Sequence, residues 1–253
     1  MKNQYIADIG DYGKYGLLRY LLQNGLQLGI NWYMTPDDGR SDGSHREYLN
    51  NAQYRVYDPI LYDEMKCMAS LDDKTIEAVQ SSRILDGAIF FSDVLATNDC
   101  HWRDRAEERD NWHQRALEQL KETQLIFADP DNGLSSRKKQ GDKSSSKYVL
   151  PKEIEDYYNR GQDVVYYHHR PRKDPEGWMR DKNQILYYLP EAKLLGLSFN
   201  RWSCRTYIFV VHGEQYKSYR ELLDSFLKTP WGTARVEGKA AFVPEPLAAR
   251  YSH

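Results

Sequence analysis

The sequence predicts a single α/β domain built around a mostly parallel sheet. Short apolar runs of strand length alternate with longer segments whose apolar residues recur at helical spacing. One run, residues 125–128, is apolar throughout and ends at an Asp-Pro-Asp-Asn-Gly turn, residues 129–133, as a buried parallel strand would. The 253 residues suffice for one large core, and neither a repeat nor a long linker marks a boundary. We therefore expect one domain over residues 1–253.

The individual elements follow from the same patterns. Residues 5–23 begin with a polar turn and continue with leucines at helical spacing, which predicts an amphipathic helix with acids near its positive end. On a charged helix at 102–121, Arg109, Trp112 and His113 share one face. The remaining expected elements are a strand at 29–34, mostly helical segments over 44–82, a strand at 88–94, helices at 151–160, 184–189 and 216–227, and strands at 163–167, 192–198 and 205–211.

The composition indicates a soluble, intracellular protein. Its three cysteines are far apart and odd in number, so neither a disulfide framework nor a Cys-x-x-Cys zinc site is expected. A reducing cytoplasm is the simplest setting. No apolar run approaches the roughly 20 residues that span a bilayer, so no membrane partner is expected. The oligomeric state is left open.

The formal net charge of −2 is an average over the whole chain, and residues 137–147 are strongly basic. Residues 135–147 are rich in serine and lysine and have no apolar anchor, which predicts a mobile, exposed loop. From 137 to 147 the only acid is Asp142, so this loop suits a polyanionic partner. The 20 tyrosines and 6 tryptophans could stack on bases, although aromatic residues also pack at strand edges.

Two strand ends carry side chains able to do chemistry. Asp129, Asp131 and Asn132 follow the strand at 125–128, and His168 and His169 follow the strand at 163–167. Ligands of open α/β sheets bind at the carboxyl ends of the strands, so we expect the active site here. Neighbouring residues on a strand face opposite sides, so at most one of these histidines should line the cleft. The competing interpretation is a plain tight turn, with the histidines satisfied by backbone carbonyls.

The order of elements resembles that of Rossmann-type adenine N6-methyltransferases that act on large-subunit ribosomal RNA. These enzymes have Asp-x-x-Lys before a long helix, matched by Asp11 and Lys14, and a catalytic Asp-Pro-Pro-Tyr after a central strand, where this chain has residues 129–132. The likeness covers most of the chain in order and spacing. It implies a Rossmann-like, methyltransferase-like sheet with helices on both faces, S-adenosylmethionine as cofactor, and a base-binding surface with Asp11, Lys14 and Tyr15.

The chain departs from that family at two functional positions. The family's methyl-donor loop is an acid followed by Gly-x-Gly, whereas residues 35–39 here read Thr-Pro-Asp-Asp-Gly. Bulky and charged side chains there would keep the backbone away from the cofactor. The aromatic fourth residue of the catalytic tetrapeptide, which stacks on the flipped base, is replaced by Asn132. We therefore expect an enzyme without a cofactor.

Two carboxylates without a donor loop favour hydrolysis of the N-glycosidic bond of a flipped base. Asp129 or Asp131 would orient water or stabilise an oxocarbenium-like sugar. Asn132 would read a base edge, and His168 or His169 would donate to the leaving base.

A chemical analogy with uracil-DNA glycosylases points the same way. Those enzymes have Asp-Pro at a strand end, like residues 129–130, and a His before a Pro, like residues 169–171. The expected partner is nucleic acid, DNA rather than RNA, with the modified bases of phage DNA as one target and phage defence as one role. Tyr148, Tyr166 and Tyr167 would flank the extruded base. The residues expected to hold phosphates are Arg137, Lys138, Lys139, Lys143, Lys147, Arg170, Arg172 and Lys173.

Three other functions stay open on the sequence alone. Methyl transfer could persist with a divergent donor loop, Asp129 then holding the target amino group. The chain could instead be a non-catalytic, nucleic-acid-binding relic of the methyltransferase fold. A metal-dependent nuclease is the weakest, because Pro130-Asp131 begins like a restriction-type motif but no Asp/Glu-x-Lys follows at a suitable distance. We expect no metal site.

Overall fold

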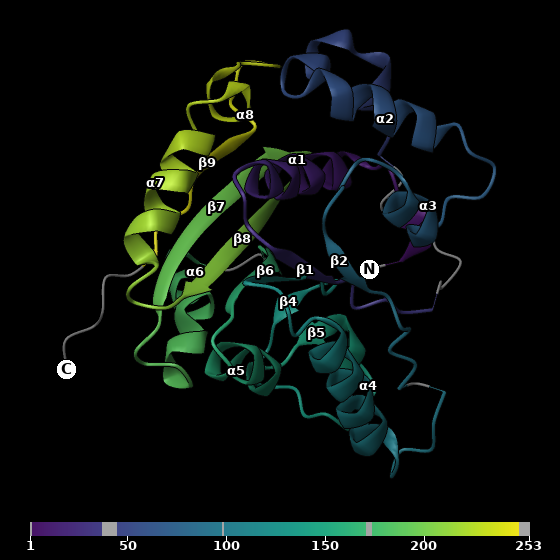
Figure 1. Ribbon diagram of the computed structural model, residues 1–253, viewed down its shortest axis with the longest axis vertical. Helices are drawn as coiled ribbons and strands as arrows, with labels where there is room; N and C mark the ends of the chain where they lie inside the picture. The colour runs from purple at the N-terminus through teal and green to yellow at the C-terminus, as the bar shows by residue number, and fades with distance from the viewer. Residues whose placement is uncertain (1, 37–44, 98, 171–173, 248–253) are drawn as a thin grey trace.

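The computed structural model describes residues 2–36, 45–97, 99–170 and 174–247. Within these residues seven strands form one central sheet, in the order β2-β1-β3-β6-β8-β7-β9 (Figure 1). A separate pair of short strands lies beside it. The strands are β1 (Leu28–Asn31), β2 (Ile89–Phe91), β3 (Leu125–Ala128), β6 (Asp163–His169), β7 (Lys193–Arg201), β8 (Ser203–Val211) and β9 (Phe242–Pro244), with β4 (Gly133–Leu134) and β5 (Tyr148–Val149) in the small pair.

The central sheet is mostly parallel, as the sequence predicts. Strands β2, β1, β3 and β6 are parallel neighbours, whereas β8 runs antiparallel to β6 and β7, and β9 runs antiparallel to β7. Five of these seven strands therefore point in one direction. The chain passes from β1 outward to β2 and returns to β3 on the other side of β1, so the strand order reverses between β1 and β3.

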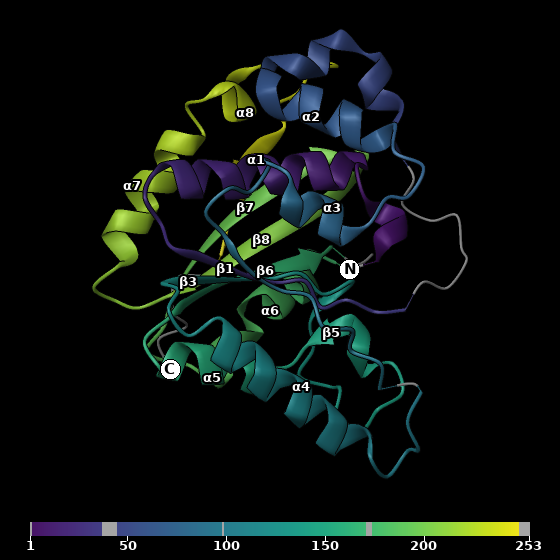
Figure 2. The same ribbon diagram turned by 45° about the vertical axis from the view of Figure 1, so that its right-hand side comes forward.

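Helices cover both faces of the sheet (Figures 1 and 2). One face carries α1, α2, α3, α7 and α8, and the other carries α4, α5 and α6. Each face has its own core, and β3 serves both, because Leu125 and Phe127 pack on the α1 side while Ile126 and Ala128 pack on the α4 side. The helices are α1 (Ile9–Gln23), α2 (Pro59–Ala69), α3 (Ile76–Ser81), α4 (Arg105–Gln119), α5 (Pro151–Asn159), α6 (Pro175–Asn183), α7 (Tyr216–Phe226) and α8 (Pro230–Thr233).

Helix α1 lies unusually close to the sheet because glycines face β7 and β8. A Cβ atom on Gly13 would stand 2.5 Å from the Phe199 ring, and one on Gly10 would stand 2.3 Å from the Arg205 guanidinium carbon. Gly16 follows at the same three-residue interval, and a Cβ atom on it would collide with the Trp231 ring. The absence of side chains on this face of α1 brings the start of the helix against the sheet.

Several predicted elements differ in their bounds or identity. The strand expected at 29–34 ends at Asn31, because Tyr33 adopts a left-handed φ of 46° that ends the extended backbone. The helix expected at 184–189 is wrong: Asp174 caps a helix that begins at Pro175, and only a single 3-10 turn follows it at Gln184–Tyr187. The small β4–β5 pair and the edge strand β9 were not predicted.

The shared face of Arg109, Trp112 and His113 on α4 is buried. Arg109 forms a two-point ion pair with Glu153 of α5, with its Nε 2.6 Å from Oε1 and its Nη2 3.0 Å from Oε2. Burial raises the pKa of Glu153, but the guanidinium outweighs it and holds that pKa below its ordinary value. These residues fasten α4 to α5 and belong to the core of that face. No helix among the described residues combines the length and apolar character needed to cross a membrane.

Candidate active site

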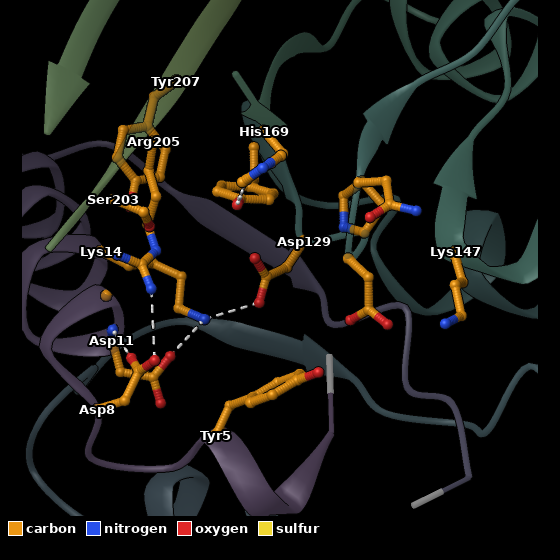
Figure 3. Close-up of a pocket in the computed structure, with 15 residues that line it drawn as sticks. Tyr5, Asp8, Asp11, Lys14, Asp129, Lys147, His169, Ser203, Arg205 and Tyr207 are labelled. Carbon is orange, nitrogen blue, oxygen red and sulfur yellow. Dashed lines mark hydrogen bonds and ion pairs between the residues drawn. The ribbon is translucent and has the colours of Figure 1, made fainter. Parts of the chain in front are cut away.

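A cavity of about 350 Å³ opens at the carboxyl ends of β3 and β6 (Figure 3). We call it the α1–β3 cavity. Five segments line it: residues 5–14 at the start of α1, the turn after β3, the end of the basic loop at Lys147, the end of β6 and the first half of β8. It lies on the side of the sheet edge where ligands of α/β proteins bind. Its lining residues are Tyr5, Asp8, Gly10, Asp11, Lys14, Asp129, Pro130, Asp131, Asn132, Lys147, Tyr167, His169, Ser203, Arg205 and Tyr207.

Lys14 is the centre of the cavity floor. Its Nζ lies 2.7 Å from Oδ2 of Asp129 and 2.8 Å from Oδ1 of Asp11, and the three side chains are almost fully buried (Figure 3). The hydroxyl of Tyr15 donates to the other Asp11 oxygen at 3.3 Å. Asp11 and Lys14, the two residues that match the Asp-x-x-Lys pattern, are thus in contact with each other, and Lys14 joins α1 to the turn after β3.

A second ion pair joins α1 to β8. Asp8 caps α1 by accepting the Asp11 backbone N–H at 2.7 Å, and its other oxygen lies 3.4 Å from Nη2 of Arg205. Arg205 reaches Asp8 by passing over Gly10, the position where a Cβ would occupy the space of the guanidinium. The missing side chain of Gly10 is therefore part of the cavity's construction.

The buried charges shift each other's proton affinities. Burial raises the pKa of Asp11 to about 6, against the opposing attraction of Lys14. Burial also raises the pKa of Asp8, with Arg205 opposing it. For Lys14 burial lowers the pKa, but the carboxylates of Asp11 and Asp129 outweigh it and hold that pKa well above its ordinary value. The cavity thus holds a permanent ammonium beside a carboxyl that can exchange a proton near neutral pH.

The turn after β3 is held by its own backbone. Gly133 has a φ of 99°, and a Cβ there would lie 2.3 Å from Nδ1 of His168, so only glycine fits. The Asn132 N–H donates to the Lys147 carbonyl at 2.9 Å, which ties the turn to the end of the basic loop. These contacts leave Asp131 and Asn132 half-buried on the cavity wall.

The two adjacent histidines lie on opposite faces of the sheet, as strand geometry predicts. His169 lines the cavity, and its Nδ1 lies 3.3 Å from the hydroxyl of Tyr167. His168 is buried on the other face, where its Nδ1 accepts the Leu134 N–H at 3.1 Å and its ring stacks on Trp178. The expectation that His168 could donate to a leaving base is therefore corrected, because its ring packs against α6 and away from the cavity.

Three of the expected tyrosines also lie outside the cavity. Tyr15 and Tyr166 are fully buried, and Tyr148 pairs with Gly133 in the small sheet while its carbonyl accepts from Arg109 at 2.7 Å. Tyr15 is linked to the cavity by the hydrogen bond from its hydroxyl to Asp11. Tyr167 is the one of the expected tyrosines that lines the cavity.

Of the expected phosphate-binding residues, Lys147 lines the cavity. The guanidinium of Arg170 lies 5.8 Å from the Trp178 ring centre, beside α6. Arg172 and Lys173 fall outside the described residues. The other members of the set lie on the neighbouring loop, outside the cavity lining: Arg137, Lys138, Lys139 and Lys143.

The basic loop, residues 135–147, is held by polar contacts where an apolar anchor is missing. Ser145 and Ser146 are buried, and the Ser145 hydroxyl donates to the Gln140 carbonyl at 3.0 Å. Gln140 in turn donates to Asp110 of α4. The mobility of this loop stays a prediction.

Sequence reasoning missed Asp8, Arg205 and the aromatic residues Tyr5 and Tyr207 as parts of the site. Asp8 has the pattern of a helix cap, and its second contact is made 197 residues away in sequence. One signal was available for Arg205, because a charged residue just before a buried apolar run, residues 207–211, needs a partner. Tyr5 and Tyr207 carry no distinguishing pattern.

The cavity lining carries four aspartates against the cations Lys14, Lys147 and Arg205. Its formal charge is therefore negative, which suits a neutral or developing positive group and disfavours a phosphate inside the cavity. Among the described residues, no three His, Cys, Asp or Glu side chains are placed to hold a metal ion.

Comparisons with known proteins add little to this geometry. No protein-family model matches the chain, and no curated protein matches it. Among solved structures, it is similar to the crystal structure of protein LPL1258 from Legionella pneumophila str. Philadelphia 1, assigned to the family model DUF519. That similarity has a TM-score of 0.42 at 14% sequence identity and covers 95% of this chain and 96% of the other. A structural similarity at this level does not indicate a function.

Proposed function

We propose that the α1–β3 cavity is the active site of a hydrolase that cleaves the N-glycosidic bond of a nucleobase extruded into it from nucleic acid. The observation that carries the proposal is the acid-rich floor, Asp11 and Asp129 around Lys14, facing a neutral His169 in one cavity. Two carboxyl groups in one cavity are typical of enzymes that hydrolyse glycosidic bonds.

The carboxylates would act on the sugar. Cleavage breaks the bond between C1′ and the base nitrogen, the electron pair leaves with the base, and C1′ gains positive charge in the transition state. The net negative lining stabilises that charge, with Asp129 held in place by Lys14. Asp131, half-buried on the cavity wall, takes the proton from the water whose oxygen bonds to C1′.

His169 would act on the leaving base. Partial desolvation at the cavity wall and the nearby Arg205 lower the pKa of His169, so its imidazole is mostly neutral at pH 7. Burial raises the pKa of Tyr167, which therefore keeps its proton and can donate to Nδ1 of His169. That bond leaves the other ring nitrogen with the proton, so it can donate a hydrogen bond that stabilises the base as it leaves as an anion. Asn132 offers a carboxamide to a base edge beside it.

The charge distribution favours a polymer over a free nucleotide. The acid-rich cavity disfavours phosphate, while Lys147 at the cavity and the cations of the adjoining basic loop suit phosphates outside it. A volume of about 350 Å³ is at the lower end of the roughly 300–1,000 Å³ of ligand pockets, which suits one base and its sugar. DNA is the preferred substrate of the proposal, with a modified base such as those of phage DNA as the target.

Methyl transfer is the second candidate, favoured by the sheet. The order of the parallel strands reverses between β1 and β3, as in doubly wound Rossmann-like sheets that bind cofactors at this point. The residues after β1 argue against S-adenosylmethionine. Trp32 and Tyr33 are fully buried in the two cores. None of residues 32–36 lines the cavity, and residues 35 and 36 are the described part of the donor-loop position.

The test is incubation of the full chain with oligonucleotides that each carry one non-standard base, followed by alkaline cleavage at abasic sites. Strand cleavage at the modified position is expected, and it should fall at least 100-fold in Asp129→Asn, Asp131→Asn and His169→Ala. Asp224→Asn on the surface of α7 is the control and should keep full activity. Retention of activity in both cavity aspartate variants would overturn the site assignment.

Calorimetry with S-adenosylmethionine separates the two candidates. The hydrolase hypothesis predicts that S-adenosylmethionine does not bind. Micromolar binding of S-adenosylmethionine, together with transfer of a labelled methyl group to DNA or RNA, would favour the methyltransferase instead.

A further inference from the structure

Trp202 differs from the other exposed aromatic residues in its backbone. It occupies the tip between β7 and β8 with a φ of 60°, and its side chain is 72% exposed. A left-handed φ is a genuine outlier for a bulky residue, and glycine or asparagine would take this position more readily. Such outliers persist only where the surrounding structure imposes them, and they cluster at functional sites.

The tip that carries Trp202 is firmly held. The preceding residue, Arg201, is buried and donates to the carbonyls of Val236 at 3.0 Å and Lys239 at 2.6 Å, and to the Tyr57 hydroxyl. The indole itself lies against the imidazole of His45, with ring centres 4.0 Å apart and an angle of 31° between the planes. Trp202 is thus an exposed ring in a fixed orientation.

This ring pair adjoins the α1–β3 cavity. Ser203, the next residue in the chain, lines the cavity, as does Arg205 two residues later. The His45 carbonyl accepts the Ile9 N–H at 3.0 Å, which places His45 at the start of α1 beside Asp8. The pair therefore stands at the cavity rim, at the junction of α1 and β8.

We propose that Trp202, oriented by His45, is a stacking platform for a nucleobase next to the one that enters the cavity. The proposal rests on the proposed function for its nucleic-acid partner. An indole face stacks on any base, and a fixed ring loses little conformational entropy on binding. The ring's partner is an imidazole and the next residue, Ser203, lines the polar cavity, so the tip suits a planar polar group better than an apolar surface.

The test is fluorescence anisotropy of a labelled single-stranded 12-mer with the full chain at low salt, on wild type and three variants. Trp202→Ala should weaken binding roughly tenfold, and Trp202→Phe should retain most of the affinity because it keeps a ring. Trp202→Asn suits the left-handed backbone, so it should keep the wild-type Tm while losing affinity as alanine does. Trp102→Ala removes a tryptophan that is 62% exposed before α4 and is the matched control, expected to bind as wild type.

The outcomes separate this inference from the proposed function. Wild-type affinity in Trp202→Ala, or an equal loss in Trp102→Ala, overturns the platform while leaving the hydrolase intact. Failure of the wild-type chain to bind any oligonucleotide overturns the nucleic-acid partner and the platform together. Tenfold weaker binding in Trp202→Ala and Trp202→Asn, with unchanged Tm and with release of base still detectable at saturating DNA, supports both.

Discussion

The Nζ of Lys14 lies 2.7 Å from Oδ2 of Asp129 and joins α1 to the turn after β3 across 115 residues of sequence. The side chains of Lys14 and Asp129 are only 6% and 8% exposed, so water screens this contact little. The same ammonium also forms an ion pair with Asp11, with Nζ 2.8 Å from Oδ1. One residue of α1 thus sets both the position and the charge of the cavity floor.

Lys14→Met should destabilise the protein strongly. Methionine keeps the length and apolar stem of the side chain but leaves the carboxylates of Asp11 and Asp129 buried without their cation. Removing one partner of a buried pair costs about 3–5 kcal/mol, and we expect a loss of that order in the free energy of unfolding in urea at pH 7. Lys121→Met, which breaks an exposed pair with Glu118, is the control and should leave stability unchanged. An equal effect of the two substitutions would contradict the central place of Lys14.

Asp11 should make stability depend on pH in the direction opposite to most carboxyl groups. Burial raises the pKa of Asp11 from 3.8 to about 6, so between these values the folded state holds a proton that the unfolded state has released. The contribution of Asp11 to stability is therefore largest below about pH 4, falls as pH rises to about 6, and is constant above that. This difference in pKa between the unfolded and folded states corresponds to a change of about 3 kcal/mol in the free energy of unfolding.

The measurement for Asp11 is the difference in unfolding free energy between wild type and Asp11→Asn, taken from pH 4 to pH 8. The wild type should lose stability relative to the variant across pH 4–6. Asp224→Asn, an exposed substitution on α7, should show no such trend. A difference that does not vary with pH would show that the pKa of Asp11 is ordinary.

Gly13→Ala should destabilise α1 although alanine is the better helix former. The gain in helix propensity is about 1 kcal/mol. The new Cβ would lie 2.5 Å from the buried Phe199 ring, which packs against Phe242 and has little room to move. Overpacking of this kind costs about 1–3 kcal/mol and more in a rigid site, so the clash should win. Gly213→Ala, where no atom lies within 4 Å of the new Cβ, should be close to neutral in the same thermal unfolding series. A higher Tm for Gly13→Ala would contradict the close approach of α1.

The parts of the fold that could be predicted are those with a local cause. The apolar run at 125–128 identified β3, and the Asp-Pro-Asp-Asn-Gly sequence identified its turn, because strand burial and turn chemistry act within a few residues. The opposite orientation of His168 and His169 followed from the two-residue period of a strand.

The parts that could not be predicted depend on contacts between distant segments. Asp8 and Arg205 meet only because Gly10 has no side chain, and nothing in their own neighbourhoods indicates that pairing. The site residues Tyr15 and Tyr148 were expected in the cavity for their chemistry, but their exposure depends on how α1 and the small β4–β5 sheet pack. Sequence patterns indicate which residues have side chains suited to chemistry. Whether those side chains are exposed or buried is decided by the tertiary structure.

His168 and His169 offer the sharpest test of where the site lies, because adjacent residues should respond in opposite ways. His168→Ala leaves the Leu134 N–H without its acceptor and removes a ring stacked on Trp178, so it should cost about 1–3 kcal/mol of unfolding free energy or more. His169→Ala removes an exposed ring at the cavity and should leave stability nearly unchanged. In single-turnover base release, His169→Ala should be slower by about 10²–10⁴-fold, whereas folded His168→Ala should approach the wild-type rate. The reverse pattern, with His168→Ala inactive and stable, would place the site on the α4 side of the sheet.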